Sequence, residues 1–204
     1  MKEFWNERYA AESFAYGKEP NFFLKHSLEK LKFDGHLLLP AEGEGRNAVF
    51  SAKKGIKVTA YDISEEGKQK AEKFAENENV QIDYKVGELD SHNFKEESFD
   101  GIALIYAHFP ENKEEIHKKL AKLLKPNGYF ILEGFSVDNI SYREKNPKVG
   151  GPANKDMLYT VEEMKTTFPN FEIIQLEQTE TELNEGKYHN GIASVIRFIG
   201  RKKG

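Results

Sequence analysis

Short apolar runs alternate along the chain with segments in which apolar residues recur every three or four positions. The apolar runs occupy residues 36–39, 56–62, 80–86, 99–106 and 129–135. Strand-like runs separated by amphipathic helices are typical of βαβ units with a mostly parallel sheet. Helices are expected over residues 46–54, after the N-cap Ser64, and along the stripe Ile116, Leu120, Leu123 and Leu124.

The C-terminal part of the chain shows a different pattern. Two apolar segments, around residues 171–176 and 192–199, are separated by a polar stretch without helical periodicity. We therefore expect an antiparallel hairpin whose strands are joined by a loop of about a dozen residues. The whole pattern predicts an α/β fold: a Rossmann-like three-layer sandwich with a seven-stranded, mostly parallel sheet and an antiparallel C-terminal hairpin strand.

One segment interrupts this rhythm. Residues 136–159 include two prolines and two glycines between positions 147 and 152, together with several charges. Long insertions in a compact domain are more often functional or disordered than idle, so we expect a lid or substrate loop here. Thr160 is positioned to cap a short helix that follows. We expect one domain over residues 1–204, with residues 1–34 as an N-terminal helical cap.

Composition narrows the range of functions. Acidic residues outnumber basic ones by 34 to 30 and the basic residues are interspersed, which does not favour nucleic-acid binding. No apolar run reaches the ~18 residues of a membrane span, and the first residues lack the apolar core of a signal peptide, so we expect a cytoplasmic protein. The absence of cysteine excludes disulfides and a cysteine nucleophile.

No metal site is expected, because the histidines show no metal-ligand spacing with nearby acids. We interpret most of them as surface or structural residues: His26, His36, His92, His117 and His189. Neither a membrane nor a nucleic acid is expected as a partner, and the oligomeric state is left open.

The first strand runs directly into a glycine-rich turn at residues 41–47, from which a helix starts. Backbone N–H groups and the positive helix end face whatever lies over such a turn, and Gly43 and Gly45 allow a close approach. The glycines also fit a purely steric interpretation of a tight turn. Asp62 lies 19 residues beyond Gly43 at the end of the next strand. A carboxylate there can accept both hydroxyls of a ribose, or serve as a turn residue before Ser64.

These features resemble the motif series of class I S-adenosylmethionine-dependent methyltransferases. The resemblance includes the glycine-rich turn, the acidic strand end, Gly87-Glu88-Leu89 and residues 124–129, and spans residues 35–135. Within that superfamily, residues 44–48 and the N-terminal segments 5–9 and 16–21 are similar to the tellurite-resistance TehB-like branch. The resemblance implies binding of S-adenosylmethionine and methyl transfer to a small-molecule acceptor.

The resemblance also implies which residues hold the cofactor. The glycine-rich turn would pass under the methionine part, Asp62 would hold the ribose, and Glu88 with Leu89 would contact the adenine. Ala107 and His108 would face the methyl group. The implied cofactor-binding set is Ala41, Glu42, Gly43, Gly45, Arg46, Asn47, Asp62, Ile63, Glu88, Leu89, Ala107 and Tyr16.

Two positions depart from the family pattern. The superfamily places an acidic residue two positions before the first glycine of the turn, where this chain has Leu39, and Ala41 replaces that glycine. We expect Ala41 to adopt a negative φ angle. Glu42 would then replace the missing carboxylate as the partner of the ligand's amino group. A chain that has lost the cofactor would instead be a non-catalytic sensor on the same scaffold.

Candidate acceptor-side residues follow from their positions. His108 ends a buried strand, where it would act as a base, orient an anionic acceptor, or be a turn residue satisfied by backbone groups. Tyr142, Arg143 and Tyr159 lie in or beside the inserted segment and could hold the charge of an acceptor. Surface loops also carry such residues by chance.

Methyl transfer from a sulfonium requires alignment and exclusion of water more than a dedicated base. An anionic acceptor, such as a thiolate or a chalcogen oxyanion, needs only positioning, whereas a hydroxyl or an amine needs a proton acceptor. The alternative enzyme is an NAD-dependent oxidoreductase, because residues 43–48 also satisfy the dinucleotide pattern. The short chain after the fifth strand counts against it, since a second mononucleotide half would not fit.

Overall fold

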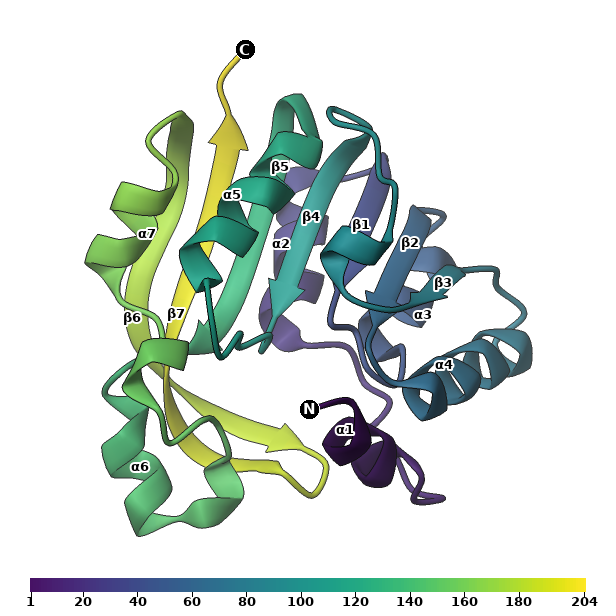
Figure 1. The fold of residues 1–204 in the computed structure, drawn as a ribbon, viewed down its shortest axis with the longest axis vertical. Helices are drawn as coiled ribbons and strands as arrows, with labels where there is room; N and C mark the ends of the chain where they lie inside the picture. The colour runs from purple at the N-terminus through teal and green to yellow at the C-terminus, as the bar shows by residue number, and fades with distance from the viewer.

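A computed structural model describes residues 1–204, and its centre is a seven-stranded sheet in the order β3-β2-β1-β4-β5-β7-β6. The neighbouring strands from β3 to β5 are parallel, and β7 runs antiparallel to both β5 and β6 (Figure 1). The strands are β1 (His36–Pro40), β2 (Lys57–Asp62), β3 (Asp83–Val86), β4 (Phe99–Ile105), β5 (Leu124–Phe135), β6 (Phe171–Glu185) and β7 (His189–Lys202). The predicted fold class is confirmed.

Two of the helices begin at the capping side chains that the sequence predicts. Ser64 accepts a hydrogen bond from the amide of Gly67, and Thr160 accepts one from Glu163, as expected for N-caps. The helices are α1 (Lys2–Tyr9), α2 (Phe22–Leu31), α3 (Arg46–Lys53), α4 (Glu65–Asn77), α5 (Lys113–Leu123), α6 (Asn139–Lys145) and α7 (Val161–Thr167).

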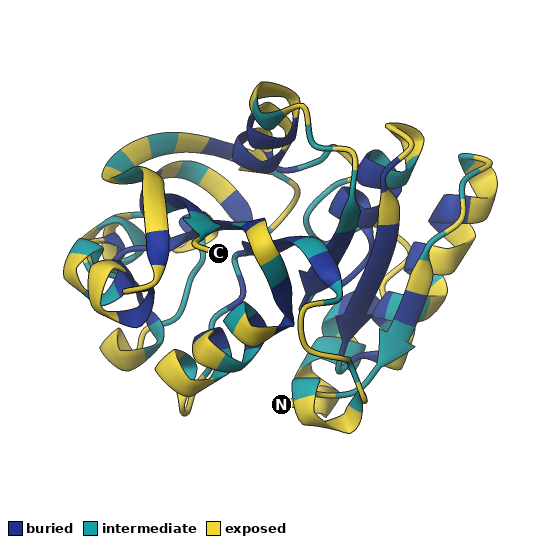
Figure 2. Cartoon of the chain, turned by 90° about the horizontal axis from the view of Figure 1, so that it is seen from above, coloured by how far each residue is buried: buried dark blue, intermediate teal, exposed yellow.

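Two apolar cores cover the two faces of the sheet. Successive side chains of a strand point to opposite faces, so Leu38 of β1 joins the core beside α5 and α7, while Leu37 and Leu39 join the core beside α2 and α3. Figure 1 shows α5 and α7 in front of the sheet and α2 and α3 behind it. In Figure 2 the inner strands are largely buried, whereas the edge strand β6 and the outer faces of the helices are largely exposed. The three-layer sandwich follows from this two-sided burial.

The C-terminal hairpin is longer than the sequence predicts. The expected loop of about a dozen residues was wrong, because β6 continues to Glu185 and β7 starts at His189, which leaves only residues 186–188 between them. Glutamate is depleted in strands, and it hides the alternation here. The period of two is nevertheless present, since Thr179, Thr181 and Leu183 are less exposed than the residues between them. This ribbon bends away from the sheet and ends beside α1 (Figure 1).

The inserted segment 136–159 is ordered rather than a structureless loop. It contains α6 and two short 3₁₀ turns, Pro147–Val149 and Lys155–Met157. Val149 and Leu158 are buried in a small core with residues of β5, β6 and β7. The proline and glycine signals therefore mark turns between short helical pieces. Two strand boundaries also differ from the prediction, since β3 starts at Asp83 and β5 starts at Leu124.

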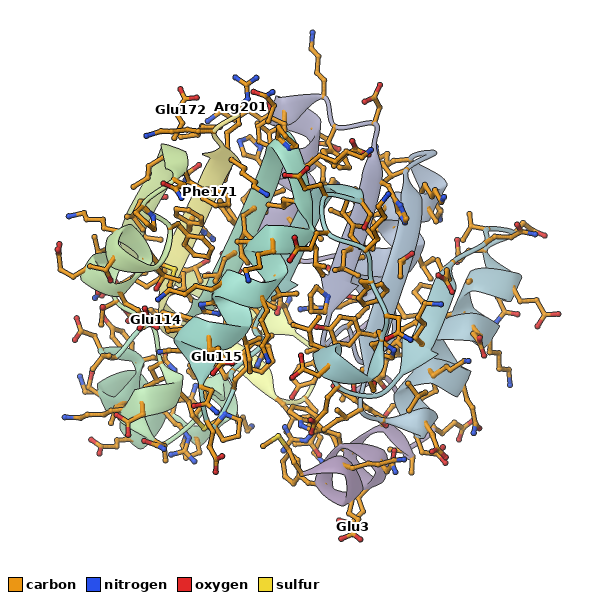
Figure 3. All side chains as sticks on the ribbon, turned by 45° about the horizontal axis from the view of Figure 1, so that its top comes forward. Glu3, Glu114, Glu115, Phe171, Glu172 and Arg201 are labelled. Carbon is orange, nitrogen blue, oxygen red and sulfur yellow. The ribbon has the colours of Figure 1, made fainter.

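The two ends of the sheet differ in character. Figure 3 shows Phe171, Glu172 and Arg201 at one end, where Glu172 and Arg201 are register partners, and Glu3 of α1 beyond the other. The carboxyl ends of the parallel strands point towards α1 (Figure 1). None of the helices is both long enough and apolar enough to cross a membrane.

Candidate active site

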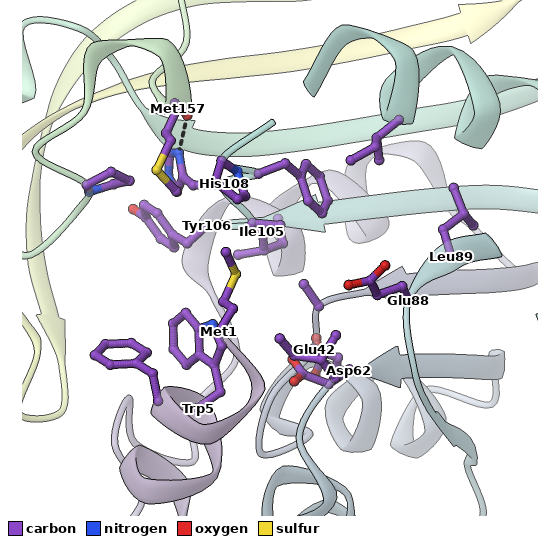
Figure 4. A pocket seen from close by; sticks show the side chains of 18 of the residues that line it. Met1, Trp5, Glu42, Asp62, Glu88, Leu89, Ile105, Tyr106, His108 and Met157 are labelled. Carbon is purple, nitrogen blue, oxygen red and sulfur yellow. Dashed lines mark hydrogen bonds between the residues drawn. The ribbon is translucent and has the colours of Figure 1, made fainter. Parts of the chain in front are cut away.

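A cavity of about 1020 Å³ opens at the carboxyl ends of β1, β2 and β4. The chain order of the sheet reverses between β1 and β4, which is where α/β sheets bind ligands. Figure 4 shows Glu42 and Asp62 on the strand side of this cavity, with Trp5 of α1 and Met1, which precedes that helix, on the other side. Ten of the predicted cofactor-binding residues line it: Tyr16, Ala41, Glu42, Arg46, Asn47, Asp62, Ile63, Glu88, Leu89 and Ala107.

Gly43 and Gly45 do not line the cavity. Both have positive φ angles, +62° and +83°. A Cβ atom on Gly43 would lie 2.6 Å from the hydroxyl oxygen of Tyr9, and one on Gly45 would lie 2.5 Å from the Cβ atom of Ala71. The steric interpretation of these glycines therefore holds in this structure, because they let α1 and α4 pack against the turn.

Ala41 contradicts the expected backbone geometry. Its φ angle is +51°, so the expectation of a negative angle was wrong. A left-handed conformation costs an alanine about 1–2 kcal/mol, because its Cβ atom approaches the following carbonyl oxygen. The turn thus keeps a glycine-like conformation at this position although glycine is absent.

Glu42 caps the helix that follows the turn. Its Oε1 atom accepts hydrogen bonds from the amides of Asn47 and Ala48, each at 2.7 Å, and its Oε2 atom accepts one from the Asn47 side chain at 3.2 Å. Burial raises the pKa of Glu42 to about 7, against these hydrogen bonds, which lower it. A carboxylate offers about four lone pairs, so one remains for a ligand donor. The predicted role toward an amino group is compatible with this geometry and stays a prediction.

Asp62 is buried and held by the backbone. Its Oδ2 atom accepts a hydrogen bond from the amide of Gly43 at 3.0 Å, and its Oδ1 atom accepts one from Ser64 at 2.9 Å. Burial raises the pKa of Asp62 to about 6, while the backbone hydrogen bonds oppose the shift. Each oxygen keeps a lone pair for a ligand hydroxyl. A ribose diol therefore fits the aspartate where it lies in the cavity wall.

His108 lines the cavity with both ring nitrogens already bound to backbone. Its Nδ1 atom lies 2.8 Å from the carbonyl oxygen of Met157, and its Nε2 atom accepts from the amide of Phe135 at 3.3 Å (Figure 4). One neutral tautomer satisfies both contacts. Burial lowers the pKa of His108 to about 4. The geometry matches the predicted turn residue and leaves no free nitrogen to take a proton.

The predicted substrate residues are not brought together. Arg143 lines the cavity, whereas Tyr142 and Tyr159 lie outside its lining. Tyr142 is bound to the carboxylate of Glu180 on β6. Tyr159 is buried and donates a hydrogen bond to the carbonyl oxygen of Ala107, so it supports the loop after β4 from behind.

A buried charge network that the sequence did not reveal closes the opposite side of the cavity. Glu185, at the end of β6, accepts hydrogen bonds from Arg46 Nη2 at 2.9 Å, His189 Nδ1 at 3.2 Å and Asn21 Nδ2 at 3.3 Å. Burial alone would raise the pKa of Glu185, but Arg46 and the hydrogen bond from His189 outweigh it and hold the pKa at about 2. Glu185 is therefore ionised at neutral pH.

The same network ties the N-terminal segment to the sheet. Asn21 caps α2 with its side-chain oxygen. Its backbone amide donates a hydrogen bond to Asn47 Oδ1, and its side-chain nitrogen donates one to Glu133 at 2.7 Å. Glu133 also accepts from Arg197 Nε at 2.6 Å. Residues of the hairpin tip pair with the N-terminal segment as well, since the amide of Lys187 donates to the carbonyl oxygen of Ala15.

His189 lies in the cavity wall and is buried, so its interpretation as a surface residue was wrong, whereas the alternative of a structural residue is compatible with its contacts. Only 6% of the residue is exposed, and the ring contacts Tyr16 and Tyr106 at centroid distances of 4.5 and 4.6 Å. Burial lowers its pKa, and Glu185 opposes that shift. The signal in the sequence was the pair Glu185 and His189 on either side of Gly186, which would have indicated a tight hairpin turn.

Comparison with known proteins places the chain among methyltransferase folds. Residues 40–128 match the family model described as a methyltransferase domain. TehB from Haemophilus influenzae superposes with a TM-score of 0.70 at 18% identity, over 99% of this chain and 67% of that one. A methyltransferase dependent on S-adenosylmethionine from Methanosarcina mazei gives 0.69 at 20% identity, over 90% and 99% of the two chains.

A further similar structure comes from work on the conversion of a disulfide bond into a thioacetal group during echinomycin biosynthesis. It superposes with a TM-score of 0.75 at 18% identity, over 100% of this chain and 92% of that one. At these identities the likeness concerns the fold. A comparison with curated protein sequences gave no significant match.

Proposed function

We propose that the chain, which combines a match to a methyltransferase domain at residues 40–128 with the class I methyltransferase fold, is an S-adenosylmethionine-dependent methyltransferase. Its acceptor in this proposal is a small molecule that carries a thiol or a chalcogen oxyanion. The observation that carries the proposal is the position of Asp62. This buried carboxylate has a free lone pair on each oxygen and lies at the carboxyl end of β2, in the wall of the cavity.

The cavity has two sides with different chemistry. We call the side formed by Ala41, Glu42 and Asp62 the donor side, and the side formed by Tyr16, Tyr106 and His189, with Glu185 behind His189, the acceptor side. S-Adenosylmethionine, when bound, supplies a methyl group on a positively charged sulfur. Asp62 would hold its ribose and Glu42 would accept from its amino group, because both carboxylates keep unused lone pairs. The family likeness adds Glu88 and Leu89 for the adenine.

The acceptor side favours a small molecule with an apolar body. Tyr16, Tyr106 and Phe135 line it, with Arg8 and Arg143 also in the cavity wall. Arg8 donates a hydrogen bond to the Tyr16 hydroxyl at 2.8 Å and lies over the Tyr188 ring at 4.2 Å. Aromatic walls with a few placed cations suit a polarisable or anionic acceptor atom and exclude water around it. The chalcogen oxyanion is included because the N-terminal motifs resemble the tellurite-resistance branch of the superfamily. We expect the protein to act in the cytoplasm.

Replacement of Asp62 by Asn tests the donor side. The neutral side chain loses the charge that strengthens hydrogen bonds to ribose, which are worth about 1.5–3 kcal/mol when one partner is charged. We expect the affinity for S-adenosylhomocysteine to fall about tenfold or more, measured by titration calorimetry. His26→Asn, an exposed change on α2, is the control and should bind as the wild type does. Unchanged affinity of Asp62→Asn would remove the observation on which the proposal depends.

A turnover screen with small thiols and chalcogen oxyanions then tests the acceptor. Methylation of a member of either class supports the proposal. Tight binding of S-adenosylhomocysteine without turnover of any acceptor would instead support a non-catalytic sensor on this scaffold.

A further inference from the structure

We propose that His189 is the catalytic base of this site and that Glu185 positions it, so that the acceptor enters with its proton, as a neutral thiol. The inference rests on the proposed function and selects between its two acceptor classes. A chalcogen oxyanion arrives already ionised and needs no base, whereas a thiol must lose a proton as its sulfur bonds to carbon.

The imidazole of His189 is held in one tautomer. Its Nδ1 atom lies 3.2 Å from Glu185 Oε2, and that carboxylate is fixed by Arg46 and Asn21. An ionised carboxylate only accepts, so Nδ1 carries the hydrogen and Nε2 keeps its lone pair. Nε2 has no hydrogen-bond partner in the protein, yet it is not fully buried. The ring itself lines the cavity. His189 thus presents an unused proton acceptor to the site.

The position of His189 relative to the end of β4 fits this role. Its ring packs against Tyr106, which directly precedes Ala107, and against Phe135 at a centroid distance of 5.1 Å. Tyr106 itself holds a positive φ angle of +51°, which turns the chain into the cavity wall after β4. His108 cannot take the same role, because both of its nitrogens are engaged by backbone groups.

The proposed step balances without a further reactant. As the acceptor sulfur forms its bond to the methyl carbon, the bond between that carbon and the donor sulfur breaks and its electron pair stays on the donor sulfur. The acceptor proton moves to His189 Nε2, and the resulting imidazolium faces the ionised Glu185. The proton then leaves to water. The products are the methyl thioether, the demethylated donor and one proton.

The charged and titratable groups around His189 come from several elements. Glu185 favours the protonated imidazole and Arg46 and Arg8 disfavour it. His108 lies close enough for its own pKa to be affected by His189. The groups that face the ring are Arg8 of α1, Tyr16 of the N-terminal segment, Arg46 of α3, Tyr106 and His108 after β4, and Glu185 of β6.

The test compares His189→Asn with wild type, using 2-phenylethanethiol as a neutral acceptor and selenite as an anionic one. Asparagine can still donate to Glu185 but has no ring nitrogen that accepts. Because general-base catalysis contributes about 10²–10⁴-fold, we expect kcat for the thiol to fall at least about 100-fold at pH 7, with KM little changed. The deficit should shrink as the pH approaches the pKa of the free thiol, because the thiolate that then predominates needs no base. Selenite turnover, if present, should be unaffected.

A second readout does not depend on turnover. Nitrogen chemical shifts of labelled histidine in the unliganded wild type should show His189 with hydrogen on Nδ1 only, and Glu185→Gln should mix the two tautomers. His26→Asn serves as the matched control in both experiments. Thiol turnover by His189→Asn with the wild-type rate and pH profile would overturn the proposal, as would a hydrogen on Nε2 at neutral pH. If the wild type methylates neither probe, the proposed acceptor class is wrong. The tautomer measurement still shows whether Nε2 of His189 is free to accept a proton.

Discussion

The donor side and the acceptor side of the cavity are built from different kinds of contact. On the donor side, neighbouring βα units meet through hydrogen bonds from backbone amides to carboxylates, such as that from Gly43 to Asp62, 19 positions apart. On the acceptor side, side chains from distant parts of the chain meet in one charge network, and Arg46 reaches Glu185 across 139 positions. Only contacts of the first kind can be predicted from local sequence motifs.

Arg46 contributes to both sides of the cavity. Its backbone starts α3 directly after the glycine-rich turn, and its guanidinium binds Glu185 at the tip of the hairpin. One residue therefore joins the start of α3, beside the donor side, to the charge network of the acceptor side. Substitutions that affect only one side show how far the donor side and the acceptor side are independent of each other.

The largest effect is expected from Arg46→Ala. The side chains of Arg46 and Glu185 are only 9% and 14% exposed, so removal of the arginine leaves a buried carboxylate without its main counter-charge. We expect the free energy of unfolding to fall by about 3–5 kcal/mol in urea denaturation. Lys53→Ala removes an exposed ion pair with Glu78 and should cost less than about 1 kcal/mol. Equal effects of the two substitutions would contradict the buried network.

Gly45→Ala should be next in size and should act on the donor side alone. A methyl group there meets both the side chain and the backbone of Ala71 on α4, in addition to the strain of a positive φ angle. We expect a loss of about 2–4 kcal/mol from overpacking and strain together. Gly55→Ala is the matched control, because Gly55 has a φ angle of +82° but open space around it. That control should lose only about 1 kcal/mol.

The pH dependence of stability in Glu42→Gln tests whether the carboxyl group of Glu42, on the donor side, is buried. The pKa of Glu42 is raised from 4.5 to about 7, so the folded state binds a proton that the unfolded state has released. The stability from this group is present below about pH 4.5 and is lost as the pH rises through 7. Relative to wild type, Glu42→Gln should therefore gain stability between these values, by at most about 1.4 kcal/mol per pH unit. Buried histidines shift in the opposite sense, but they cancel in this difference.

Chemical denaturation of both proteins at several pH values measures the effect. Glu162→Gln, at an exposed position on α7, is the control and should give a flat difference. A flat difference for Glu42→Gln as well would show that its carboxyl group is not buried in solution.

The smallest effect is expected from Ala41→Gly. Glycine relieves a positive φ angle that costs alanine about 1–2 kcal/mol, but it also loses about 0.5–1 kcal/mol of chain entropy on folding. We expect a gain of about 0.5 kcal/mol in thermal denaturation. Affinity for S-adenosylhomocysteine should change by less than about twofold, since only a methyl group leaves the cavity wall. A marked loss of stability would show that Ala41 does not occupy the left-handed region.

The same division explains what the sequence could predict. Hydrophobic periodicity and capping residues such as Ser64 locate most strands and helices, and the spacing from Gly43 to Asp62 leads to the donor side, because these signals act over one or two neighbouring elements. Glu185 and His189 could not be found in this way. The strand that ends at Glu185 is rich in glutamate, and the partners of Glu185, Arg46 and Asn21, come close only once the sheet and the N-terminal segment have assembled.

Backbone conformation was the other limit. The sequence does not show that Ala41 takes a positive φ angle, because the turn around it imposes a conformation against its own preference. Nor does it show that His108 is fully bound by backbone, since Met157 belongs to a segment that sequence periodicity could not describe.

A crystal structure with bound S-adenosylhomocysteine tests the central claim most directly. The account predicts that both ribose hydroxyls bind the carboxylate of Asp62, and that the sulfur faces the part of the cavity lined by Tyr106 and His189. A nucleoside bound away from Asp62, or a sulfur directed away from the hairpin tip, would contradict it.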